Sequence, residues 1–192
     1  MRIIPTGVLS DLAEQLLLRD NPRLCELGPG RANEPARPLL ERLTPATLLR
    51  NEGRTDRGMA ECCCAALWLY HDFLDESHRM SQEIETPEGS YWHGIMHRRE
   101  PDADNANYWF RRVGKHSVFP LLQTAACGLA RQSPTEGQSE FLTRQTAWDY
   151  GRWIDLCEAA RTGRTTPATV ELCRQIQAEE WRLLFAHCLG EC

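Results

Sequence analysis

Apolar side chains recur along this chain at the three- to four-residue period of amphipathic helices, and no stretch shows the sustained alternation that indicates a strand. Thr-Pro pairs mark several starts, because threonine caps a helix and proline suits its first position. The pattern predicts about seven helices, over residues 8–19, 59–82, 87–99, 102–113, 118–131, 140–161 and 168–189, with a short helical turn after Thr44-Pro45.

Proline and glycine are concentrated in residues 21–38, which we predict to be a loop. The chain shows no internal repeat and no low-complexity tract. At 192 residues it is long enough for one domain with a sizeable core. These features predict an all-α protein that forms a single-domain irregular bundle of helices over residues 1–192, with little or no strand.

Charge and hydropathy narrow the class of protein. The formal net charge is −5, and no basic stripe stands out, so we expect no binding to nucleic acid. No window approaches the roughly 18 apolar residues that a membrane helix needs, and the first residues lack the apolar core of a signal peptide. We therefore expect no association with membranes.

Nine cysteines occur in the chain, three of them in a row at Cys62, Cys63 and Cys64. Neighbouring residues on a helix point about 100° apart, so this triplet does not converge on one metal ion. We interpret the cysteines as reduced, buried side chains of a cytoplasmic protein.

Candidate chemistry is concentrated in residues 68–116, which hold five of the six histidines and eight of the fifteen aromatic residues. Two sets of polar residues share the spacing i, i+4, i+7: His71, Asp75 and His78 in the first, and His93, His97 and Glu100 in the second. A helix repeats every 3.6 residues, so each set lies along one stripe. Imidazoles and carboxylates are costly to bury unless they bind each other or a ligand, which predicts a polar site here.

The first hypothesis is a metal site between the helices over residues 59–82 and 87–99. Helices joined by a short turn pack antiparallel, which would bring the two stripes face to face. His93 and His97 have the spacing of a bidentate metal pair. We expect them to bind zinc, iron or manganese together with Asp75 and either His71 or His78.

If this site is catalytic, the polar groups that do not bind the metal supply acid–base chemistry. The candidates for that role are His71, His78 and Glu100. The sequence leaves open whether the protein is an enzyme.

The second hypothesis is a pocket for a small anionic molecule, with or without a metal. Arginine pairs end two consecutive predicted helices, and a guanidinium matches a carboxylate or phosphate as a planar fork. Nearby aromatic side chains would form apolar walls. The residues predicted to bind the ligand are Arg98, Arg111, Tyr91, Trp92 and Trp109.

An alternative class is a binding or scaffolding protein without catalysis. His71 with Asp75, and His97 with Glu100, also have the spacing of hydrogen-bonded pairs on one helix. The polar cluster would then be a structural network. A third hypothesis is that the aromatic-rich segment forms the face of a homodimer.

Part of the segment is distinctive as a block: YHDFLDESH, followed by GSYWHGIMHRREPD and NYWFRRVG. This block, about a quarter of the chain, resembles a signature shared by uncharacterised bacterial and fungal proteins. The resemblance implies that the segment is a family signature, and it implies no activity, cofactor or catalytic residue.

Overall fold

The computed structural model describes residues 7–17, 21–50, 56–133 and 137–190. Over these ranges the chain forms ten α-helices and four short 3-10 helices, and an isolated bridge between Leu9 and Leu49 is the only β pairing described. The predicted all-α class is confirmed, although about seven helices were expected. None of the described helices is both long enough and apolar enough to cross a membrane.

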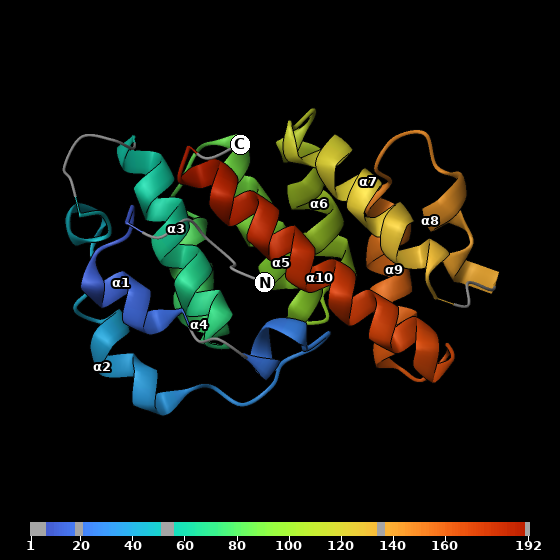
Figure 1. The fold of residues 1–192 in the computed structure, drawn as a ribbon, viewed down its shortest axis with the longest axis horizontal. Helices are drawn as coiled ribbons and strands as arrows, with labels where there is room; N and C mark the ends of the chain where they lie inside the picture. Colours follow the sequence, from blue (N-terminus) through green and yellow to red (C-terminus); the bar gives the residue numbers. More distant parts are fainter. Residues whose placement is uncertain (1–6, 18–20, 51–55, 134–136, 191–192) are drawn as a thin grey trace.

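Figure 1 shows how the helices are arranged, with α10 running obliquely from beside α3 toward the side of the bundle that holds α9. It packs against α3 at one end and against α7 and α9 toward the other. The elements are α1 (Asp11–Leu16), α2 (Arg37–Leu40), α3 (Arg57–Tyr70), α4 (Leu74–Ser81), α5 (Pro87–Arg99), α6 (Ala103–Val113), α7 (Val118–Arg131), α8 (Phe141–Arg144), α9 (Tyr150–Arg161) and α10 (Pro167–Cys188).

Polar side chains cap three of these helices, two of them at Thr-Pro pairs as predicted. Thr86 caps α5 by accepting from the backbone N–H of Gly89 at 3.1 Å. Asp102 caps α6 and Thr166 caps α10 in the same manner. Each cap satisfies one of the N–H groups that the first turn leaves without a partner.

The helix predicted over residues 59–82 is wrong as a single element, because α3 ends at Tyr70 and α4 begins at Leu74. Asp72 adopts a left-handed backbone conformation, with φ at 64°. Its carboxylate binds Arg99 at 2.5 Å. This tertiary contact holds a turn that the local periodicity does not reveal, so His71 does not continue the helix that carries His78.

Other boundaries also differ from the prediction, and α1 begins at Asp11 instead of residue 8. The segment over residues 140–161 is divided into α8 and α9, because Asp149 caps a new helix by accepting from the N–H of Arg152 at 3.0 Å. The predicted loop over residues 21–38 contains 3-10 turns at Pro22–Cys25 and Glu34–Ala36 and the start of α2.

Helix α5 lies inside the bundle, and twelve of its thirteen residues are buried. A helix that is buried on every side must have each of its polar side chains satisfied by neighbouring elements. This requirement explains why α5 carries most of the polar contacts described below.

Candidate metal centre

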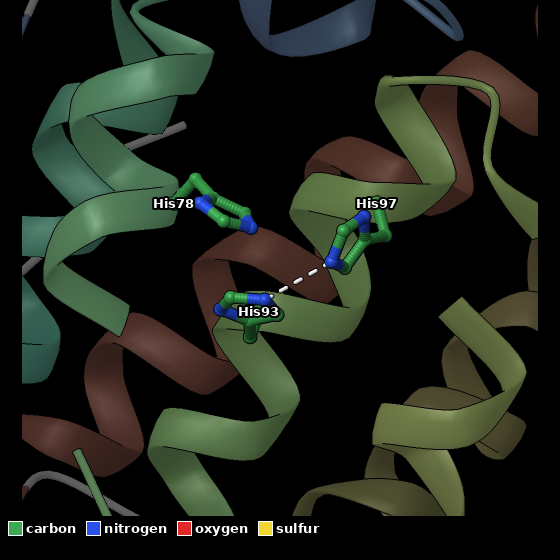
Figure 2. A group of neighbouring side chains, drawn as sticks. All are labelled: His78, His93 and His97. Carbon is green, nitrogen blue, oxygen red and sulfur yellow. Dashed lines mark hydrogen bonds between the residues drawn. The ribbon is translucent and has the colours of Figure 1, made fainter. Parts of the chain in front are cut away.

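Three histidines converge between α4 and α5, as Figure 2 shows. His78 extends from α4, and His93 and His97 lie on successive turns of α5. One ring nitrogen from each lies within 4.8 Å of the others, near enough to hold a metal ion. The Nε2 atoms of His93 and His97 are 3.0 Å apart. The rings of His78 and His93 have their centroids 4.6 Å apart.

Burial favours the neutral form of two of these rings. His93 and His97 are buried, whereas His78 is half-buried. Burial, with the neighbouring rings of His97 and His78, lowers the pKa of His93 to about 3. Burial also lowers the pKa of His97, although Glu100 opposes the shift. Neutral imidazole is the form that binds a metal ion.

The Nδ1 atoms of the two buried rings face oxygen atoms. His93 Nδ1 lies 2.9 Å from the Ser81 hydroxyl, which in turn donates to the backbone carbonyl of His78 at 3.3 Å. His97 Nδ1 lies 3.0 Å from a carboxylate oxygen of Glu100. That contact is within ion-pair distance but is not aligned as a straight hydrogen bond. These partners favour a proton on Nδ1, which leaves the Nε2 lone pairs directed at the shared space.

Trp109 on α6 packs against the centre. Its ring centroid lies 4.0 Å from that of His93. The close approach of α6 to α5 depends on Gly94, because a Cβ at that position would lie 2.8 Å from the ring of Phe110. Of the residues predicted to bind a substrate, Trp109 is therefore the one that the structure brings to the histidines.

Two predicted members of the site lie elsewhere. Asp75 is exposed on α4 and is not part of the histidine group. His71 is fully buried at the end of α3, where its Nε2 lies 2.8 Å from the Leu16 carbonyl and its Nδ1 lies 3.0 Å from the Asn33 amide. Both ring nitrogens are thus occupied by protein groups, and His71 joins the amino-terminal segment to α3.

Arg98 is buried in a contact with Glu180 and does not face a ligand. The guanidinium and the carboxylate are 2.5 Å apart, and both side chains are almost completely buried. Tyr91 donates to the same carboxylate at 3.2 Å, and the indole of Trp153 donates to it at 3.3 Å. Two of the predicted ligand-binding residues therefore belong to a core network between α5, α9 and α10.

The remaining predicted ligand-binding residues are also separated. Trp92 is fully buried, with its ring 6.0 Å from that of Trp181. Arg111 is exposed on α6. Surface hollows of about 520 Å³, along α7 and α10, and about 350 Å³, beside α9, contain none of the three clustered histidines. The aromatic walls and arginine fork predicted for an anion pocket are not brought together.

A second titratable cluster was missed by the sequence reasoning. Glu88 at the start of α5, His116 before α7 and His187 in the last turn of α10 lie close together. No local spacing connects these three positions, so only the tertiary structure shows the cluster. Ser81 was missed as well, since a serine on a helix carries no signal of its partner.

Comparison of the chain with protein-family models, with curated proteins and with solved structures found no match. The site is therefore interpreted from its own geometry.

Proposed function

We propose that the protein binds one divalent transition-metal ion through His78, His93 and His97, with zinc as the best fit. The observation that carries the proposal is the direction of the imidazoles. The Nδ1 atoms of His93 and His97 face Ser81 and Glu100, and their Nε2 atoms face each other. Histidine ligands of metals have this pattern, with the second nitrogen bound to a carboxylate, hydroxyl or carbonyl.

The distances support a small tetrahedral ion. Zinc binds imidazole nitrogen at about 2.0–2.1 Å, which places two tetrahedral ligands roughly 3.3 Å apart. His93 and His97 are close to that separation at 3.0 Å. His78 offers the third nitrogen, within 4.8 Å of the other two. Iron and manganese, also expected from the sequence, accept the same nitrogen ligands.

Three histidines leave one coordination position of a tetrahedral ion for water or another ligand, as in catalytic zinc sites. Zinc held by these residues would supply a bound water that is acidic near neutral pH. Glu100 is half exposed beside His97, where it is placed to exchange protons with solvent. We propose a small, anionic molecule as the ligand, attracted by the ion itself since Arg98 is committed to Glu180. The expected cytoplasmic location is part of this proposal.

Metal binding is tested by purifying the untagged protein, removing bound metal with a chelator and titrating zinc by calorimetry. We expect about one ion per chain, and less than ~0.2 for His78→Gln. His78 is suited to this test because it is half-buried and its loss leaves the core intact. Asp75→Asn, on the exposed face of the same helix, is the matched control. Unchanged zinc binding by His78→Gln would remove the proposal.

A second candidate function is a scaffolding role, and the short contact between the Nε2 atoms of His93 and His97 favours it. A proton on either Nε2 makes the 3.0 Å approach of His93 and His97 a hydrogen bond within a structural network that needs no ion. A scaffolding role predicts that zinc leaves the melting temperature unchanged, and that His93→Ala lowers it strongly by leaving partners unsatisfied. A binding site predicts stabilisation by zinc.

A further inference from the structure

The second cluster joins three parts of the chain that are distant in sequence. His187 Nε2 lies at hydrogen-bond distance, 3.2 Å, from Oε1 of Glu88. His116 Nε2 lies 3.5 Å from the same oxygen, within ion-pair distance but not aligned as a hydrogen bond. The two imidazole centroids are 4.8 Å apart. By distance alone this group resembles a metal site as much as the three histidines do.

The contacts of the Nδ1 atoms distinguish this cluster from the cluster of His78, His93 and His97. The backbone N–H of Val118 donates to Nδ1 of His116 at 3.2 Å. A ring nitrogen that accepts a hydrogen bond carries no proton, so the Nε2 of His116 must carry one. A protonated nitrogen has no lone pair for a metal ion, whereas it is a suitable donor to Glu88. At His93 and His97, by contrast, Nδ1 faces acceptors.

We infer that Glu88, His116 and His187 form a polar latch, in which N–H groups of the two rings face the carboxylate and no metal ion is bound, and that this latch fastens the end of α10 to the start of α5. His187 is the second partner of Glu88: its Nε2 faces the carboxylate, and the Ser117 hydroxyl lies 3.4 Å from its Nδ1. The latch is largely buried: the side chains of His116, Glu88 and His187 are 3%, 12% and 21% exposed.

The helix dipoles support this arrangement. Glu88 lies in the first turn of α5, where the dipole favours a negative charge, and His187 lies in the last turn of α10, where it favours a positive one. The N–H of His116 facing the carboxylate, assisted by the backbone of Glu88 itself, by His187 and by Thr86, lowers the pKa of Glu88 to about 2 against the opposing effect of burial.

Acid should open this latch. A carboxylate whose pKa is lower in the folded protein than in the unfolded protein stabilises the fold at any pH above the unfolded-state pKa. That stability is lost as the pH falls through the folded-state pKa. For Glu88 the range runs from about 4.5 down to about 2. A protonated Glu88 would also place its own O–H donor against the N–H groups of His116 and His187, which need an acceptor.

Other titratable groups surround the cluster. Cys62 on α3 interacts with the charge of Glu88, Cys188 on α10 interacts with His187, and the ring of Tyr91 meets that of His116 edge-on at 5.3 Å. Cys188 also shares hydrogen bonds with Cys62 and Cys63. The Glu88 and His187 variants keep all of these other groups. A difference in stability between a variant and the wild-type protein therefore reports on the latch itself.

The latch is tested by comparing Glu88→Gln with Glu85→Gln, an exposed control three residues earlier. We expect Glu88→Gln to lower the melting temperature at pH 7 by about 5–10 °C, and the deficit to shrink as the pH falls from 5 toward 3. The control should follow the wild-type protein. An unchanged melting temperature, or a deficit independent of pH, would overturn the latch.

A second variant keeps the inference testable if Glu88→Gln does not fold. His187→Gln, at a partly exposed position, should bind zinc with the wild-type stoichiometry, while hydrogen exchange accelerates in the last turns of α10. A loss of zinc in this variant, or unchanged exchange, would contradict the assignment. If the wild-type protein binds no zinc, the proposed metal centre fails and the exchange and acid measurements still decide on the latch.

Discussion

His97 and Glu100 are one helical turn apart, and Nδ1 of the imidazole lies 3.0 Å from the exposed carboxylate. In a metal centre this contact orients the ring and increases the basicity of Nε2. The same contact is the part of the site that can be changed without touching a ligand or the core.

We therefore expect Glu100→Ala to weaken zinc binding by about 10–100-fold while the stoichiometry stays near one ion per chain. Competition with a chromophoric chelator measures the affinity. Asp104→Ala removes another exposed carboxylate nearby and should change the affinity less than twofold. Equal weakening by both variants would indicate a general effect of surface charge and not a specific contact.

The Arg98–Glu180 pair gives a prediction about stability instead of ligand binding. Arg98→Met would leave the buried Glu180 carboxylate with Tyr91 and Trp153 as its only donors among the contacts described. Breaking a buried ion pair on one side costs about 3–5 kcal/mol in the free energy of unfolding. Urea denaturation measures this loss.

Arg111→Met is the matched control, because Arg111 is exposed on α6. Its effect should stay within about 0.5 kcal/mol. If Arg98→Met kept its stability and instead lost affinity for anions, the sequence-based assignment of Arg98 to a ligand pocket would be correct and the structural interpretation wrong.

The sequence predicted the part of the centre that depends on local geometry. His93 and His97 lie on one unbroken helix and Glu100 is its C-cap residue, so their spacing placed them together. His78 joined them because a short connection brings α4 against α5. These relationships follow from helix periodicity and from the packing of consecutive helices.

The rest depended on contacts between distant segments. Asp72 holds the turn between α3 and α4 through Arg99, so the first stripe is broken and Asp75 turns to solvent. Arg98 finds its partner, Glu180, 82 residues further along the chain. Local patterns carry no information on such pairs, because a buried arginine and an exposed one occur in the same sequence context.

His71 gives the last prediction, which concerns pH. Its Nε2 must donate to the Leu16 carbonyl, so its Nδ1 accepts from the Asn33 amide and the ring is neutral. Burial, with a smaller effect from Arg23, lowers the pKa of His71 from 6.5 to about 4, against the hydrogen bond to Leu16. The folded state therefore binds a proton less readily than the unfolded state below pH 6.5. Its contribution to stability is complete above that pH and is lost as the pH falls to about 4.

We expect the difference in unfolding free energy between the wild-type protein and His71→Gln to shrink by up to about 3 kcal/mol between pH 7.5 and 4. Urea denaturation across this range measures it, with chelator present so that metal binding does not contribute. Gln177→Ala is the control, because Gln177 is buried, does not titrate and donates to the Leu24 carbonyl in the same amino-terminal segment. Its destabilisation should be independent of pH. A constant difference for His71→Gln as well would mean that the pKa of His71 is the same in the folded and the unfolded protein, contrary to the burial and hydrogen bonds of the ring.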